Sequence, residues 1–197
     1  VGDTNIITSD WNKQPFCKGW RYGEGDALAV VKPENLIEFW KTLEVCVEKD
    51  LIIIMQAANT GLTGGSTPYG NDYDRPIILI NTTRIDDIHI IDNGKQIIGF
   101  AGSTLYKLEK KLEPFEREPH SVIGSTSIGA SIIGGVCNNS GGSLVKRGPA
   151  YTELSLYAKI NKNGKLELIN ELGIKLGSNV EEILNNLQNR NYNDSDV

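Results

Sequence analysis

The chain has 197 residues, enough for one domain with a sizeable core or for two small lobes that share an interface. Its net charge of -5 argues against a nucleic-acid-binding protein, because binding the phosphate backbone takes a concentrated basic face. No run of about 18 apolar residues occurs, so we expect no transmembrane helix. The three cysteines have neither paired nor metal-ligand spacing, which suits free thiols and predicts no metal site. The start at Val1 and the Asn- and Asp-rich tail suggest a domain of a longer polypeptide.

Residues 1–25 show no clear hydrophobic period, so we expect an extended arm with turns, one of them near residues 20–23. Large aromatic rings bury readily against a neighbouring core, and we expect packing rather than ligand contact for the four in this arm. They are Trp11, Phe16, Trp20 and Tyr22.

A strand, a helix and a second strand are predicted next. Residues 27–31 form a short, Val-rich apolar run, and apolar residues then recur at helical spacing from Leu36 to Val47. Residues 51–55 are wholly apolar and predict the second strand, and residues 76–80 a third. A crossover helix makes the strands that it joins parallel.

The second half of the chain carries antiparallel signals. Asn-Gly within residues 92–95 and the turn at 161–164 each predict a hairpin between flanking apolar runs, and His89 alternates so as to point to solvent. Helices are predicted over residues 105–112, capped by Ser103 or Thr104, and over 180–187.

The first of two glycine-rich stretches, residues 56–66, directly follows the second strand. Glycine adopts positive φ freely, and Asn, Thr and Ser side chains tie a turn to its own backbone, so successive N–H groups can converge on an anion. With no Lys or Arg in the stretch, a phosphate or diphosphate held by backbone dipoles and hydroxyls fits best. An ordinary surface turn is the alternative.

The second stretch, residues 124–142, has the same character, and few folds need two such loops. Its Ile128, Ile132 and Ile133 could form the apolar side of a helical turn, whose dipole would favour an anion. No Lys-Ser or Lys-Thr follows a glycine and no G-x-G-x-x-G occurs, which argues against a P-loop NTPase and a Rossmann domain.

Residues 25–31, 56–74 and 117–148 carry a resemblance to a known family. They resemble the FAD-binding domain of flavoenzymes of the p-cresol methylhydroxylase and vanillyl-alcohol oxidase type. The uninterrupted runs NNSGGSLV and REPHSVIG are most similar to the bacterial respiratory, quinone-dependent D-lactate dehydrogenases. The resemblance implies a two-lobed α+β fold over residues 1–197, with a small parallel βαβ lobe at about 26–82 and a larger, mainly antiparallel lobe at about 83–197.

The resemblance also implies that the two stretches wrap the diphosphate and flavin of FAD between the lobes. Carried over by position, the first stretch contributes Ala57, Ala58, Asn59, Thr60, Gly61, Gly65 and Ser66. The second contributes Gly124, Ser131 and Gly141, with Ser125, Gly129 and Asn138 as neighbours.

A dissociable, non-covalent flavin is expected, since covalent members of the superfamily use His or Cys. Neither stretch contains His, and the only thiol is Cys137, which we expect to pack as a small residue. His120 precedes the second stretch, where a structural role is favoured over one beside the isoalloxazine. We assign no catalytic residue, because in the family the substrate-facing groups come largely from a separate cap domain; Lys146 and Arg147 are expected to be solvated or structural.

The implied activity is oxidation of D-lactate to pyruvate, with electrons passed through FAD to quinone by a peripheral enzyme at the cytoplasmic face of the inner membrane. Cap and membrane-associating domains would lie outside this chain. One alternative is the FAD domain of another 2-hydroxy-acid dehydrogenase or oxidase, for example one acting on glycolate. Another is a module that binds a nucleotide or polyanion without redox chemistry, which the absence of a flavin spectrum would reveal.

Overall fold

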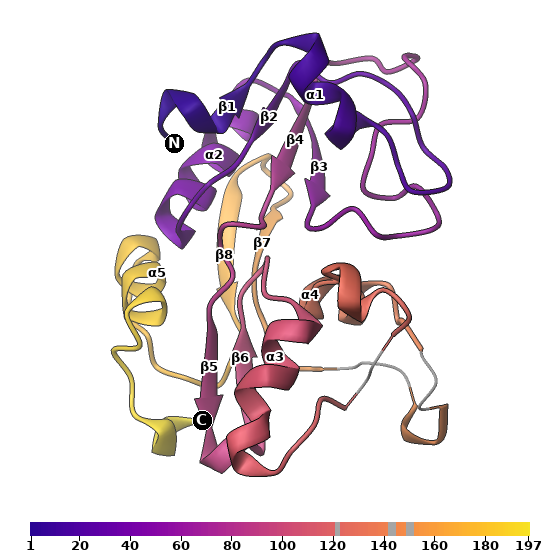
Figure 1. The fold of residues 1–197 in the computed structure, drawn as a ribbon. Coiled ribbons are helices and arrows are strands. Elements are labelled where there is room, and N and C mark those ends of the chain that lie inside the picture. The colour runs from indigo at the N-terminus through magenta and orange to yellow at the C-terminus, as the bar shows by residue number, and fades with distance from the viewer. Residues whose placement is uncertain (121–122, 142–144, 149–151) are drawn as a thin grey trace.

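The computed structural model describes residues 1–120, 123–141, 145–148 and 152–197, and its α+β architecture agrees with the sequence (Figure 1). Residues 121–122 of the REPHSVIG run and 142–144 of the NNSGGSLV run lie outside these ranges. None of the helices within them has the length and apolarity that a bilayer crossing takes.

The N-terminal sheet has the strand order β1-β2-β4-β3. Both β2 (Ala29–Val31) and β3 (Ile52–Gln56) pair in parallel with β4 (Ile77–Asn81), as the crossover predicts, and β1 (Ile6–Ile7) adds antiparallel to β2. The crossover helix α2 spans Leu36–Glu48 and begins at Asn35, whose side chain accepts a hydrogen bond from the Glu38 N–H. Residues 6–7 of β1 thus belong to the same sheet as the strands of the predicted small lobe, at about 26–82. The boundary between the lobes near residue 82 stays a prediction.

The N-terminal arm differs from the expectation, because it contains helix α1 (Asp10–Cys17). Its buried residues are Lys13 and Cys17, so no apolar stripe marks the helix in the sequence. The bend near residues 20–23 is confirmed by a hydrogen bond from the Gly19 N–H to the Gly23 carbonyl. Packing was the wrong prediction for three of the four aromatic residues, since only Phe16 packs on the core while Trp11, Trp20 and Tyr22 are exposed.

The second half of the chain contains the two predicted hairpins. Strand β5 (Ile88–Ile91) pairs antiparallel with β6 (Gln96–Gly99), and β7 (Leu156–Ile160) with β8 (Leu166–Asn170). Thr104 caps α3, as predicted, by accepting from the Lys107 N–H. The remaining helical elements are η1 (Asp3–Asn5), η2 (Asp92–Gly94), α3 (Leu105–Leu112), η3 (Glu113–Phe115), η4 (Thr126–Ile128), α4 (Ile132–Cys137), η5 (Val145–Arg147), α5 (Val180–Gln188) and η6 (Asp194–Asp196).

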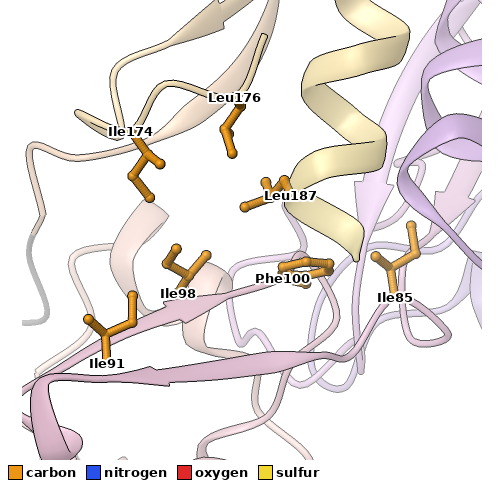
Figure 2. Packing of buried hydrophobic residues seen from close by; sticks show 7 residues of the cluster. All are labelled: Ile85, Ile91, Ile98, Phe100, Ile174, Leu176 and Leu187. Atoms are coloured by element: carbon orange, nitrogen blue, oxygen red, sulfur yellow. The ribbon is translucent and has the colours of Figure 1, made fainter. Parts of the chain in front are cut away.

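One hydrophobic cluster ties the C-terminal segment to the rest (Figure 2). Leu187 of α5 and Leu176 face Phe100 and Ile98 of the first hairpin region, and Leu36 and Phe39 of α2 pack against the same cluster. The cluster therefore joins the crossover helix of the N-terminal sheet to the antiparallel half of the molecule.

His89 does not point to solvent, which corrects the alternation-based expectation. Its side chain is buried, with the ring tilted against Phe100 and Nδ1 lying 2.6 Å from the Tyr192 hydroxyl. The sequence misled because the tail beyond α5 folds back over this face of the hairpin, and Tyr192 covers a ring that a bare hairpin would expose.

Candidate functional site

Residues 57–66, called the first loop below, leave the carboxyl end of β3 and turn by an unexpected route. Positive φ occurs at Asn59 (54°) and Gly64 (75°), whereas Gly61 and Gly65 have ordinary negative φ. Asn tolerates the left-handed region better than most residues because its short side chain bonds locally. Gly64 thus uses the conformational freedom of glycine, whereas Gly61 and Gly65 do not and need another reason.

The backbone N–H groups of the first loop are unpaired within the part of the chain that the structure describes: from 57 to 66, none donates to a described protein group. Backbone N–H groups that find no partner within the protein normally bond to water or to a ligand. A run of such donors, in a loop that contains no basic residue of its own, has the chemistry of a diphosphate cradle.

The second loop, residues 124–141, is more tightly built. Element η4 ends at Gly129 with φ 99°, and the buried Ser131 caps α4 by accepting from the Gly134 N–H at 3.0 Å. The Ile132 N–H already donates to the Ser103 carbonyl, so this six-residue helix offers few free donors at its start, and the expected dipole contribution is small.

Of the three isoleucines expected to form an apolar side here, only Ile132 packs, against the cluster around α3; Ile128 and Ile133 are exposed.

The two loops meet. A Cβ placed on Gly129 would lie 3.4 Å from the Cβ of Ala58, and Figure 1 shows α4 beside the loop that follows β3. Thr82 connects the segments that support them: its N–H donates to the Gln56 carbonyl and its hydroxyl to the Ala101 carbonyl, while the nearby Ser103 carbonyl accepts from the Ile132 N–H. The two loops lie about 70 residues apart in sequence, and the segments that support them are connected through Thr82, just after β4.

Four glycines of the expected site face open space. A Cβ at Gly61, Gly124 or Gly141 meets no described atom within 4 Å, and one at Gly65 meets only the Thr63 hydroxyl at 4.0 Å. None of the four has positive φ, so neither packing nor conformation among the described residues requires glycine there. All four positions leave room for a ligand to approach the backbone closely, and FAD fits these residues.

A hollow beside the first loop brings in residues that the sequence analysis did not assign to the site. Its volume is about 600 Å³ and it is open to solvent. Lys18 and Trp20, from the segment after α1, line it together with Ala58 and Asn59. Trp20 is 70% exposed, although large rings usually bury. An isolated Trp in an aperiodic arm was the only available signal.

The remaining candidates lie at the edge of the site or outside it. Cys137 is exposed at the end of α4, so packing was the wrong prediction, whereas Cys17 and Cys46 are buried and burial raises their thiol pKa values. His120 is exposed on a bend. Arg147 pairs with Glu118 and donates to the Pro119 carbonyl, which confirms a structural role.

A family model described as FAD binding domain matches residues 27–167. The chain belongs to this family. The p-cresol methylhydroxylase structure aligns with a TM-score of 0.64 at 15% identity, over 85% of this chain and 33% of that one, which shows the fold. The cofactor is therefore FAD, held in a fold of the p-cresol methylhydroxylase type.

Proteins named quinone-dependent D-lactate dehydrogenase are among the relatives that match this FAD-binding chain over its whole length. A protein of Haemophilus influenzae named quinone-dependent D-lactate dehydrogenase is 61% identical, and the Escherichia coli protein of that name is 57% identical. The chain spans only about a third of their length, 35% and 34% respectively.

Proposed function

We propose that this chain is the FAD-binding part of an enzyme that oxidises D-lactate to pyruvate and passes the electrons through FAD to quinone. The observation that carries the proposal is 61% identity, over all 197 residues, to a quinone-dependent D-lactate dehydrogenase. The unpaired N–H groups of the first loop and the open glycines of both loops support it, because they suit a dinucleotide cofactor.

The chain's own residues hold and orient the cofactor. The N–H groups from Ala57 to Ser66 would hold the diphosphate, and the Ser66 hydroxyl donates to Asn59 Oδ1 within the same loop. Gly124 and Gly141 would leave room for the ligand in the second loop, whose shape Ser131 stabilises as the cap of α4. Bound FAD supplies the acceptor of two electrons and a proton, and this chain provides binding and electrostatics.

The flavin is proposed to be non-covalent. Covalent attachment through a ring nitrogen or a thiol needs His or Cys at the flavin, and the two loops hold only Cys137, exposed at the end of α4. After denaturation and gel filtration, all yellow absorbance should separate from the protein; colour that stays with the chain would contradict this assignment.

The base for the hydroxyl proton and the cation for the substrate carboxylate are proposed to come from segments beyond these residues. The chain covers about a third of its relatives, and two of its described cations near the loops are paired, Arg147 with Glu118 and Lys18 with Glu24. Because quinones dissolve in the lipid phase, we further propose peripheral association with the cytoplasmic face of the inner membrane.

Substrate oxidation by the complete protein tests the proposal. Purified protein should show a flavin spectrum and reduce a soluble quinone analogue with D-lactate, faster than with glycolate or longer 2-hydroxy acids. Preference for another 2-hydroxy acid would leave the assignment as an FAD domain unchanged but would replace D-lactate as the proposed substrate. Absence of bound or bindable flavin would favour the non-redox nucleotide module instead.

A further inference from the structure

Gln56, the last residue of β3, lies at the base of the first loop and is only 2% exposed. Its Nε2 donates to the Phe16 carbonyl at 2.9 Å and to the Ser66 carbonyl at 2.8 Å, and its Oε1 accepts from Asn81 Nδ2 at 3.2 Å. The loop starts at the next residue and ends at Ser66. The buried amide of Gln56 therefore connects the two ends of the loop and bonds them to α1 and β4.

Two more amides extend this network. Asn81 Nδ2 also donates to the Ala57 carbonyl at 3.0 Å. Asn59 Nδ2 donates to the Lys18 carbonyl at 2.7 Å, and its Oδ1 accepts from the Ser66 hydroxyl at 2.8 Å. In the described structure no buried side-chain polar atom lacks a partner, so the network is complete without a ligand.

The network also sets the direction of the loop's donors. A trans peptide points its N–H opposite to its C=O, so capture of the Ala57 carbonyl by Asn81 turns the Ala58 N–H away from the core. The same amides bond carbonyls and leave the loop N–H groups unused. A cradle fixed in this way loses little conformational entropy when an anion binds.

We propose that Gln56 is a positioning residue for FAD, which with Asn81 holds the first loop in its ligand-binding shape before the cofactor arrives. The proposal rests on the proposed function, in which this loop holds the diphosphate. The proposal also involves residues 16–18, because the carbonyls of Phe16 and Lys18 accept hydrogen bonds from Gln56 and Asn59. These residues precede the family match, which begins at residue 27.

Gln56→Met in the complete protein tests the proposal, because Met keeps the side-chain length and removes both donated bonds. Gln188→Met is the matched control. Gln188 also joins separate elements through its amide, accepting from the Leu36 N–H and donating to Asp87, but it lies on α5. The measurements are the dissociation constant for FAD, from flavin fluorescence, and the melting temperature of each apoprotein.

We expect Gln56→Met to weaken FAD binding about tenfold, the effect of losing roughly one net hydrogen bond's free energy. Gln188→Met should bind FAD within about twofold of the unsubstituted protein while lowering the melting temperature comparably. Wild-type affinity in Gln56→Met, or equal weakening in both variants, would overturn the positioning role.

Asn81→Asp gives a second test if Gln56→Met does not fold. The carboxylate keeps an acceptor for the N–H and hydroxyl of Thr83 and loses the donations to Ala57 and Gln56. It should weaken FAD binding as well. Failure of both variants to fold would make the network purely structural. Failure of the unsubstituted protein to bind FAD would instead overturn the proposed function, and this inference with it.

Discussion

Gly61 and Gly64 stand three residues apart in the first loop, and they lack a side chain for different reasons. Gly64 has φ 75°, and a Cβ there would lie 2.9 Å from the Tyr22 carbonyl oxygen, so the fold itself requires glycine. Gly61 has an ordinary φ and open space in place of a Cβ. Neither conformation nor packing among the described residues therefore requires glycine at position 61, which leaves its backbone accessible to a ligand.

We therefore predict opposite outcomes for two alanine substitutions. Gly61→Ala should weaken FAD binding while leaving the apoprotein as stable or up to about 1 kcal/mol more stable, since alanine restricts the unfolded chain. Gly64→Ala should lower the free energy of unfolding by about 1 to 3 kcal/mol through backbone strain. Urea unfolding and FAD titration of both variants measure this. Unchanged FAD affinity in Gly61→Ala would remove Gly61 from the site.

His89 makes stability depend on pH. Burial lowers the pKa of His89 from its ordinary 6.5, with Arg190 and Lys111 adding to the shift and Asp87 and Asp194 opposing it. Below pH 6.5 the unfolded chain takes up a proton that the folded ring resists, so the unfolded state binds more protons and stability rises with pH. The contribution is complete above pH 6.5 and is lost as the pH falls below it.

The free energy of unfolding should therefore decrease more steeply between pH 6.5 and 5.5 in the unsubstituted protein than in His89→Gln, whose side chain does not titrate. Urea unfolding at pH 7.5, 6.5 and 5.5 gives both slopes, and carboxylates shared by the two proteins cancel in the difference. Parallel slopes would show that His89 titrates normally in the folded state.

Among individual residues, the sequence predicted those that lie in stretches of distinctive composition. Clustered glycines and hydroxyl residues marked both loops, and the loops do meet at Ala58 and Gly129. The assignment of individual ligands stays a prediction. The role of Gln56 was not visible, because its partners at Phe16 and Ser66 are backbone carbonyls, which any residue provides.

Helix α1 shows how an element can be held by charge instead of an apolar stripe. The ammonium of Lys13 lies 3.1 Å from carboxylate oxygens of Asp10 and Asp26 and 2.6 Å from the Ala27 carbonyl. Burial alone would lower the pKa of Lys13, but the hydrogen bonds to Asp26 and Asp10 outweigh it and raise that pKa. The helix is thereby pinned beside the start of β2.

Lys13→Met should loosen α1. Met can fill the space of the aliphatic chain, but the Ala27 carbonyl and the Asp26 carboxylate lose their donor, which costs about 1 to 3 kcal/mol. Because α1 and the residue that follows it carry the Phe16 and Lys18 carbonyls that support the first loop, FAD binding should weaken too. Thermal unfolding and FAD titration measure both effects; Lys49→Met, at an exposed pair with Glu48, is the control. Unchanged stability would contradict the pinning role.

Most elements were predictable because they bury a regular stripe: α2 and α3 through 3.6-residue spacing, and the hairpins through short apolar runs around turn residues. Helix α1 was missed because its inner face presents Lys13 and Cys17 and because Pro15 lies inside it, a residue tolerated best in a first turn. Strand β1 is two residues long and carries no pattern of its own.

At the scale of the whole molecule, two contacts couple the halves that carry the loops. The hydrophobic cluster joins α2 to α5 and the first hairpin, and Thr82 bridges Gln56 to Ala101 close to the loops. Neither contact involves residues adjacent in sequence, so no local pattern could reveal them. A ligand that binds both loops would add a third link and would stabilise the folded protein by mass action.

Hydrogen exchange with and without FAD tests that third link. If one diphosphate is held from both sides, FAD should slow exchange at amides of residues 57–66 and of 124–141 together, since unpaired N–H groups gain acceptors and the segments lose local opening. The tip of the β7–β8 hairpin, residues 161–164, serves as an internal control and should not change, because its turn is closed by Asn161 and lies outside both loops. Protection confined to residues 57–66 would mean that the second loop does not hold the cofactor, and the two-sided site would be wrong.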